Sequence, residues 1–336
     1  MMKMKKFINA PENLTPELLE GLAAAYPNKI KLEEGKIVVR ATPKAEDKVA
    51  IITLGGAGHE PALSGFVGYG MLDASVVGDI FAAPNAVSLL AGLRKFKRDA
   101  GILLVVLNHA GDVMSANMAM KMAEREGIKV KSILVAEDIS AGINAPINDR
   151  RGLAGCIPLF KVAGAAAEEG KSLDEVYAVA EKFNKRIATL AVAMTGCTHP
   201  QNGNPIAELA EDEMEIGMGQ HGEGGGGRSK IMTADETATE MFNKLANAVE
   251  LKAGEKVFLV INGTGACTPM EMSIVFRKCA QLAEEKGVKV VQGIIDELLT
   301  VQEMAGFQMI LCVVDDEQIK ALNAKSDTPY WTSIGM

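Results

Sequence analysis

The sequence lacks the features that mark membrane, secreted and nucleic-acid-binding proteins. No apolar run is long enough to cross a bilayer, so we expect no transmembrane span. Lysines near the N-terminus are not followed by an apolar segment, which predicts no signal peptide. Basic residues form no long block and the formal net charge is −8, so we expect neither direct nucleic-acid binding nor attachment to a membrane surface.

Cysteine is scarce, and the motifs of several enzyme classes are missing. The five cysteines form no C-x-x-C pair, which is typical of reduced thiols in a cytoplasmic protein. Neither H-E-x-x-H nor a Cys/His cluster occurs, which predicts no metal site built by this chain. No dinucleotide fingerprint opens a helix, which disfavours a nucleotide-binding oxidoreductase. The motif G-x-S-x-G is also missing, which disfavours a serine hydrolase.

Apolar periodicity predicts an α/β protein of two domains. The 336 residues exceed one typical core, and 48% of them are apolar. Up to about residue 185, continuous apolar strands alternate with helices, which predicts a three-layer domain with a parallel-rich sheet covered on both faces. The predicted strands are 49–54, 102–107 and 130–135, after a hairpin at 29–40; the predicted helices include 113–126, 155–169 and three that begin at the caps Thr15, Asn85 and Ser172.

Beyond residue 185 the strands are shorter and their turns more polar. These strands, together with a helix capped by Thr233, predict a smaller mixed α/β domain of the α+β kind. We therefore divide the chain into an N-terminal domain, 1–185, and a C-terminal domain, 186–336. The predicted C-terminal strands are 189–195, 214–218, 256–261, 289–295 and 309–314.

Glycine, at 34 residues, is in excess, and its clusters frame two histidines. In Glu215-Ile-Gly-Met-Gly-Gln-His221-Gly-Glu223, a short strand runs into glycines that present one imidazole. We predict that His221 is an exposed neutral imidazole that attacks an electrophile such as a carbonyl carbon. The alternative is a histidine in a mobile surface loop, which the glycine run 224–227 favours.

The second framed histidine, His59, follows the predicted strand 49–54 in Gly55-Gly56-Ala57-Gly58-His59. Ligands of α/β proteins gather at the carboxyl ends of strands, so we predict a ligand site where this imidazole exchanges a proton with a small polar substrate. A phosphate loop is disfavoured because the Walker lysine and the dinucleotide spacing are missing. A tight turn with a surface histidine remains the alternative.

Asp112 lies just beyond the predicted strand 102–107, in Asn108-His109-Ala110-Gly111-Asp112. A carboxylate at this place can cap the following helix, and the same position suits a general base. Because His59 also follows a strand of this sheet, we expect His59 and Asp112 to face one crevice of the first domain.

Several motifs, in order along nearly the whole chain, resemble the ketone-binding subunit of dihydroxyacetone kinases. No one motif is specific alone, but together they are highly specific. They are Gly55-Gly-Ala-Gly-His-Glu-Pro-Ala62, Gly65-Phe-Val-Gly68 with Gly70-Met-Leu72, Asn108-x-x-Gly-Asp-Val113, Arg150-Arg-Gly-Leu-Ala-Gly155, Lys161-Val-Ala-Gly-Ala-Ala-Ala-Glu168, Met214-Glu-Ile-Gly-Met-Gly-x-His-Gly-Glu223, and Asn262-Gly-x-Gly265 with Thr268-Pro269.

The resemblance implies a two-domain homodimer that binds dihydroxyacetone or another short ketose. A histidine matching His221 holds the substrate carbonyl as a covalent hemiaminal, which selects ketones and aldehydes over glycerol. An aspartate matching Asp112 acts as base on the terminal hydroxyl, and a histidine matching His59 assists. The positions assigned to substrate binding are Gly56, Ala57, Gly58, Ala83 and His109.

The resemblance also implies that this chain itself binds no cofactor. ADP and magnesium belong to a separate helical kinase subunit, and in many bacteria a phosphocarrier of the phosphotransferase system recharges that nucleotide. The missing phosphate loop fits this division of labour. We expect the protein to work in the cytoplasm.

The chain departs from the family pattern at four places around the expected site. Ala57 and Ala83 replace serines, His109 replaces a tyrosine, and Gly224 replaces a proline. These changes favour a different substrate, such as a four-carbon ketose, or a second function in the family: a ketone-binding co-activator that docks on a transcription regulator. The intact Asp112 favours the kinase subunit, because a pure sensor needs no base.

Overall fold

The computed structural model describes residues 5–335. They form two compact units, each containing a six-stranded sheet. The first-sheet unit comprises Phe7–Val135, Cys156–Asn184 and the described chain from Glu317 on. The second-sheet unit comprises Ala136–Gly155, Lys185–Asp316 and the described residues before Phe7.

The units are interleaved along the chain, which differs from the predicted contiguous domains 1–185 and 186–336. The chain passes from the first-sheet unit to the second-sheet unit between Asn184 and Lys185, next to the predicted boundary. Residues 136–155 nevertheless belong to the second-sheet unit, because Asp138 forms a parallel bridge with Thr189 there. The last segment returns to the first-sheet unit, where Asp327 forms an antiparallel bridge with Tyr69.

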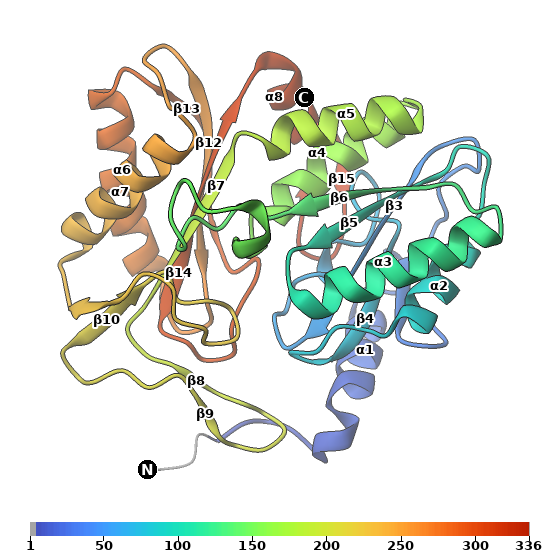
Figure 1. Cartoon of the computed structure of the whole chain (residues 1–336), viewed down its shortest axis with the longest axis horizontal. Coiled ribbons are helices and arrows are strands. Elements are labelled where there is room, and N and C mark those ends of the chain that lie inside the picture. Colours follow the sequence, from blue (N-terminus) through green and yellow to red (C-terminus); the bar gives the residue numbers. More distant parts are fainter. Residues whose placement is uncertain (1–4, 336) are drawn as a thin grey trace. The chain divides into compact units, whose positions relative to one another are not determined.

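The first sheet is mixed and mostly parallel, with the order β1-β2-β4-β3-β5-β6. Figure 1 labels its parallel strands β3 to β6. β1 and β2 form the predicted hairpin, β2 and β4 are antiparallel, and β4, β3, β5 and β6 run parallel to their neighbours. The parallel strands β3 and β5 are covered on both faces, which explains their unbroken apolar sequences. The strands are β1 (Ile30–Glu33), β2 (Ile37–Arg40), β3 (Ala50–Ala57), β4 (Ala74–Ile80), β5 (Ile102–Leu107) and β6 (Val130–Val135).

Helices cover both faces of the first sheet, which confirms the predicted three-layer arrangement. α2 and α3 pack against the face that carries Ile52, Leu104 and Val76. Helices α1, α4 and α5 contact strands of the same sheet. The helices are α1 (Leu14–Ala25), α2 (Ala86–Lys95), α3 (Ala110–Arg125), α4 (Cys156–Glu168), α5 (Leu173–Asn184) and α8 (Asp316–Asn323), and the short 3₁₀ turns of this unit are Pro11–Asn13 and Ser64–Phe66.

The second sheet is mixed and mostly antiparallel, with the order β11-β10-β7-β14-β12-β13. Only β12 and β13 pair in parallel within it. This confirms the predicted mixed α/β character of the C-terminal region. Its strands are β7 (Ile187–Ala193), β10 (Glu213–Ile216), β11 (Arg228–Lys230), β12 (Lys256–Gly263), β13 (Lys289–Asp296) and β14 (Gly306–Val314).

Two long helices, α6 (Ala234–Ala248) and α7 (Pro269–Glu285), pack on one face of the second sheet and complete its core. Each begins with a capping box, built by Thr233 with Glu236 and by Thr268 with Glu271. The smaller elements of the described chain are β8 (Cys197–Thr198) with β9 (Pro205–Ile206), β15 (Ser326–Asp327) with β16 (Thr332–Ser333), and a 3₁₀ turn at Ile147–Asp149.

Some local predictions were wrong. α1 begins at Leu14 with Asn13 at the N-cap, not at the predicted cap Thr15, whose side chain is buried. β4 and α7 were not predicted. The predicted caps Asn85, Ser172 and Thr233 are confirmed by their side-chain bonds to backbone N–H groups. Among residues 5–335, no helix is both long and apolar enough to cross a membrane.

A pair of glycines in helices tests the packing of the first-sheet unit. A Cβ at Gly164 of α4 would lie under 3.0 Å from the backbone of Gly70 and Met71, whereas a Cβ at Gly21 of α1 meets nothing. We expect Gly164→Ala to lower the free energy of unfolding by about 1–3 kcal/mol through overpacking. Gly21→Ala should raise it by about 0.5–1 kcal/mol. Urea denaturation measures both, and equal effects of the two changes would contradict this packing.

Candidate functional site

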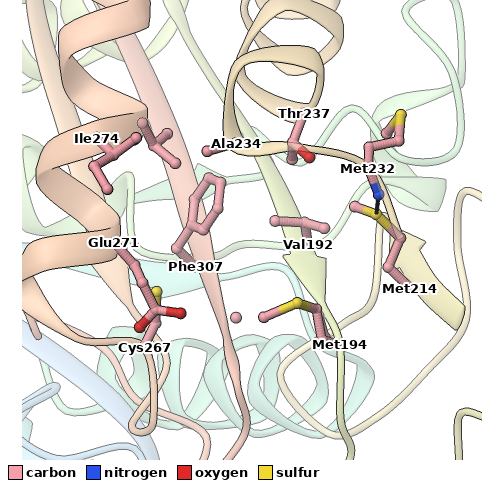
Figure 2. Close-up of a pocket in the computed structure, with 13 residues that line it drawn as sticks. Val192, Met194, Met214, Met232, Ala234, Thr237, Cys267, Glu271, Ile274 and Phe307 are labelled. Carbon is pink, nitrogen blue, oxygen red and sulfur yellow. Dashed lines mark hydrogen bonds between the residues drawn. The ribbon is translucent and has the colours of Figure 1, made fainter. Parts of the chain in front are cut away.

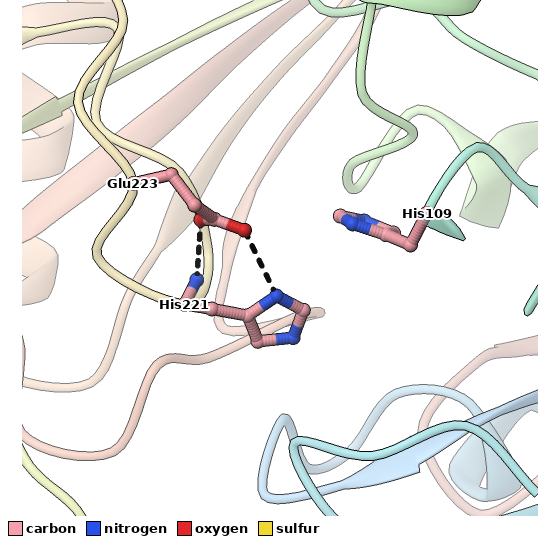
Figure 3. Close-up of side chains that lie close together, drawn as sticks. All are labelled: His109, His221 and Glu223. Atoms are coloured by element: carbon pink, nitrogen blue, oxygen red, sulfur yellow. Dashed lines mark hydrogen bonds and ion pairs between the residues drawn. The ribbon is translucent and has the colours of Figure 1, made fainter. Parts of the chain in front are cut away.

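His221 lies in the loop that follows β10, and its ring is fixed by Glu223 two residues later (Figure 3). The ring Nδ1 lies 3.1 Å from Glu223 Oε1, and the backbone N–H of His221 donates to Oε2 at 2.9 Å. The imidazole is partly exposed, with 27% of its side chain accessible. The structure thus presents the predicted nucleophile at the surface of its unit with one ring nitrogen already engaged.

The carboxylate of Glu223 decides which ring nitrogen carries the proton. Burial opposes its ionisation, but the hydrogen bonds from the His221 ring and backbone, together with the positive charge of a protonated His221 ring, lower the pKa of Glu223 to about 2. At neutral pH Glu223 is therefore an anion, which can only accept hydrogen bonds. A neutral His221 consequently carries its proton on Nδ1, which leaves the lone pair on Nε2.

The glycines around His221 form close contacts within the loop. The N–H of Gly217 donates to Ala191 O of β7 at 2.7 Å, and the N–H of Gly225 donates to Glu215 Oε1 at 3.1 Å. A Cβ at Gly226 would lie under 3.0 Å from the carbonyl of Ile216. These contacts tie the loop to β7 and β10, so the glycines serve close packing.

In the first-sheet unit, three loops that carry predicted site residues leave the same edge of the sheet. β3, β4 and β5 run parallel, and their carboxyl ends lead to His59, Ala83 and Asp112 respectively. Gly111 and Ala83 lie close together, since a Cβ at Gly111 would be 3.1 Å from that of Ala83. The topology thus brings together loops that are far apart in the sequence, as expected for a site at the carboxyl ends of strands.

His59 is buried, which excludes the alternative of a histidine exposed on a surface turn. The residue is only 5% accessible, and its ring lies 4.9 Å from the ring of Phe81, centroid to centroid. Gly58 has a φ of +103° and a Cβ there would lie 2.8 Å from the Phe81 ring. The neighbouring Glu60 accepts the Gly58 N–H at 3.0 Å, and burial raises the pKa of that carboxyl.

The remaining glycine of this loop packs against protein. A Cβ at Gly56 would lie under 3.0 Å from the backbone N of Ala82, so this glycine admits the turn that follows β4. Ala57 is buried at the end of β3. Gly56 and Ala57 also border a small cavity with Glu60 and Tyr330.

Asp112 is buried in the first turn of α3. The helix begins at Ala110 with His109 at the N-cap, so the alternative of Asp112 as the capping residue was wrong. The reason is that only Asn108 and His109 connect the strand to the helix, so the helix begins three residues earlier than the predicted 113. The N-terminal end of a helix is electrostatically favourable for an anion.

An apolar pocket lies elsewhere in the second-sheet unit, between α6, α7, β7 and β14 (Figure 2). Its few polar groups have other roles. The Thr237 hydroxyl donates to Thr233 O, Glu271 accepts from Thr268 in the capping box, and burial raises the pKa of Cys267 to about 11. The pocket therefore offers no reactive group comparable to His221. Its apolar lining includes Val192, Met194, Met214, Met232, Ile274 and Phe307.

The chain contains two mixed α/β units. One unit carries a histidine on a glycine loop, held by a carboxylate, and the other carries a histidine and an aspartate after parallel strands. These features define a class of two-sheet α/β proteins. The model of the Dak1 domain matches residues 20–330, and the chain belongs to this family. The resemblance seen in the sequence is thereby confirmed.

Three relatives illustrate the range of the family. The dihydroxyacetone-binding subunit DhaK of the PTS-dependent dihydroxyacetone kinase 1 of Listeria innocua is 37% identical, over 98% of this chain and 100% of the relative. The L-erythrulose kinase of Pectobacterium atrosepticum is 37% identical over 97% of this chain, which spans 56% of that protein. The solved structure of a dihydroxyacetone kinase operon co-activator, DhaQ, superposes with a TM-score of 0.89 and 35% identity, covering 94% of this chain and 98% of the co-activator.

The structure also identifies a buried carboxyl that the sequence analysis missed. Glu137 Oε1 accepts the N–H groups of Leu153 and Gly155 and the hydroxyl of Thr189, which ties residues 136–155 to β7. Burial raises the pKa of Glu137 to about 7, and the neighbouring Asp138 adds to the rise. No sequence motif marks this residue, because its three partners are 16, 18 and 52 residues away.

The raised pKa of Glu137 predicts a pH-dependent stability. Between the unfolded value of 4.5 and about 7, the folded protein holds a proton that the unfolded chain has lost. The contribution of Glu137 to the free energy of unfolding is therefore greatest below pH 4.5, and it is lost as the pH rises through 7. Glu137→Gln should flatten the stability profile between pH 5 and 8, measured by chemical denaturation. The exposed Glu284→Gln is the control, and parallel profiles of wild type and Glu137→Gln would contradict the prediction.

Proposed function

We propose that this chain captures a short ketose covalently on His221 and presents its hydroxyl for phosphorylation by a partner subunit. The observation that carries the proposal is the His221–Glu223 pair, in which an acceptor-only carboxylate holds Nδ1 and leaves the lone pair on Nε2. Membership of the Dak1 domain family and the similarity to a dihydroxyacetone-binding subunit support this function.

The capture step is an addition in which no atom is lost. Nε2 of His221 forms a bond to the carbonyl carbon while the C=O π pair moves to oxygen, which takes up a proton. Nδ1 loses its proton in exchange, and the product is a neutral hemiaminal. Glycerol has no carbonyl carbon to attack, so the chemistry itself distinguishes ketose from polyol.

We assign the base of the phosphorylation step to Asp112 and an assisting role to His59. A hydroxyl attacks phosphorus better when a base takes its proton, and a carboxylate is suited to that task. Gly56, Ala57, Gly58, Ala83 and His109 are the proposed substrate-binding positions. The common edge from which the loops of His59, Ala83 and Asp112 leave the sheet supports this grouping.

The phosphoryl group would come from an ADP-carrying helical subunit with magnesium, recharged by a phosphocarrier protein. The name of the Listeria relative, a subunit of a PTS-dependent kinase, supports this source, as does the lack of a phosphate loop in the sequence. We propose that the chain works as a homodimer. The substrate is dihydroxyacetone or a four-carbon ketose, and the L-erythrulose kinase relative supports the latter.

A second candidate function is a ketone-sensing co-activator that binds a transcription regulator. The TM-score of 0.89 with a solved operon co-activator favours it. The departures at Ala57, Ala83, His109 and Gly224 favour it as well. Capture on His221 serves both functions, whereas a proton acceptor at Asp112 serves only the kinase.

Covalent capture predicts a mass change that depends on one ring. Incubation with dihydroxyacetone should add the mass of one intact ketose, detected by mass spectrometry under native conditions. His221→Ala should abolish the adduct and the discrimination between ketose and glycerol. His199→Ala is the matched control, because His199 lies in a turn of the same unit, where its Nδ1 accepts the Gln201 N–H. An undiminished adduct in His221→Ala would contradict the capture site.

Asp112 should be needed for phosphoryl transfer but not for capture of the ketose. With an ADP-loaded helical subunit and a phosphoryl donor, Asp112→Asn should lower turnover by about 10²–10⁴-fold, the usual effect of removing a general base. Adduct formation should be unchanged. Asp174→Asn is the control, since Asp174 also lies in the first turn of a helix of the first-sheet unit. A wild-type protein that forms the adduct but phosphorylates no three- or four-carbon ketose with its cognate subunit would favour the co-activator.

A further inference from the structure

We propose that Arg151 is the positioning residue of the His221 loop: it ties both ends of the segment 217–223 to a buried anchor and so keeps Glu223 against the imidazole. The functional consequence rests on the proposed capture chemistry. The positioning itself concerns the unliganded protein, and it can be tested separately.

One side of the Arg151 guanidinium is held by a buried anchor. Its Nε donates to Asp138 Oδ2 at 2.7 Å, and its Nη2 donates to Ser140 Oγ at 2.7 Å. The Asp138 side chain is only 1% accessible, and it also accepts the backbone N–H and the hydroxyl of Ser140. Asp138 in turn forms the bridge to Thr189 of β7, so the anchor is continuous with the second sheet.

The other side of the guanidinium holds the loop at two points. Nη2 donates to Gly217 O at 2.6 Å, directly after β10, and Nη1 donates to Glu223 O at 3.0 Å. Nη1 also lies 3.9 Å from Glu223 Oε2, the oxygen that accepts the His221 backbone N–H. Arg151 therefore contacts the residue that fixes the imidazole through both its backbone and its charge, without needing to touch the ring.

The loop sequence makes room for this contact. A Cβ at Gly219 would lie under 3.0 Å from both Arg151 Nη1 and Glu223 Oε2. Glycine at this position thus leaves room for the arginine to approach the glutamate. Gly219→Ala would push the two apart while removing no charged group and no hydrogen-bonding side chain.

Lysine cannot replace arginine here. The planar guanidinium donates in several fixed directions at once, whereas the lysine ammonium is a single charged point on a flexible chain. Arg151→Lys should therefore keep the buried Asp138 charge paired while losing contacts to Gly217 O and Glu223 O. This makes lysine a better test than alanine, which would leave Asp138 buried without its cation and destabilise the fold.

The first readout is the tautomer of His221 in the protein without substrate. The chain has four histidines, so ¹⁵N-labelling of the imidazoles gives few signals, and His221→Ala identifies those of His221. Wild type should carry the proton on Nδ1. Arg151→Lys and Gly219→Ala should shift His221 toward a mixture of the two tautomers, with an altered pH profile of its ring signals.

The second readout is the rate of adduct formation with dihydroxyacetone. We expect Arg151→Lys and Gly219→Ala to lower this rate by about 10²-fold, the order of loss caused by a misplacement of about 1 Å. Arg186→Lys is the matched control, because Arg186 pairs with Glu255 at 3.0 Å in the same unit without contacting the loop. Thermal denaturation shows whether each variant is folded.

The outcomes separate the two proposals. A wild-type tautomer and a wild-type rate in folded Arg151→Lys would overturn the role of Arg151 while leaving capture on His221 intact. If Arg151→Lys does not fold, Gly219→Ala decides by the same two readouts. A wild-type protein that forms no adduct would overturn the proposed function, and the tautomer comparison would still decide whether Arg151 positions the ring.

Discussion

A carboxylate can only accept hydrogen bonds once it is ionised, and this constraint fixes the loop on which the proposed chemistry depends. Glu223 has three donors within reach: the ring and the backbone N–H of His221, and the Arg151 guanidinium. Because the carboxylate can only accept, the ring nitrogen that faces it must carry a proton. A neutral His221 is therefore protonated on Nδ1. The reactive lone pair then lies on Nε2 before any substrate arrives.

Buried carboxyl oxygens accept backbone N–H groups at two other places beside the sheets. Asp73, 1% accessible, accepts the Ile51 N–H at 2.7 Å and forms ion pairs with Arg40 and Lys44, which ties β2 and β3 to the start of β4. Glu137 accepts backbone N–H groups within residues 136–155, and its burial raises its pKa. Buried backbone N–H groups need acceptors, and buried acidic side chains supply them to Ile51 in β3 and to Leu153 and Gly155 outside the strands.

The sequence predicted the elements whose own residues determine them. Strands 102–107 and 130–135 were predicted with their observed bounds. For 102–107 the reason is an unbroken apolar run, which defines a strand buried on both faces. β4 was missed because its apolar run is interrupted by Gly78 and Asp79. Gly78 leaves room for the turn that follows the strand. The membership of residues 136–155 in the second-sheet unit depends on pairing with Thr189, which is far along the chain.

The site was predictable to the same extent. Glycines on either side of His221 indicated a presented imidazole, and Glu223 lies only two residues away. Arg151 is more than sixty residues from the loop that it contacts, and no local pattern connects them. At His59 the glycines were interpreted as room for a ligand, whereas Gly56 and Gly58 make room for Ala82 and Phe81. Glycine indicates a close approach, but it does not say what approaches.

The distribution of the unusual residues bears on the choice between kinase and co-activator. The groups proposed for capture, His221, Glu223 and Arg151, all lie in the second-sheet unit. Ala57, Ala83 and His109, three of the four departures from the family pattern, lie in the first-sheet unit, with the proposed base Asp112. Capture therefore belongs to a part of the chain that both functions share. Whatever distinguishes phosphorylation from sensing, including the length of the ketose accepted, is expected in the loops after β3, β4 and β5.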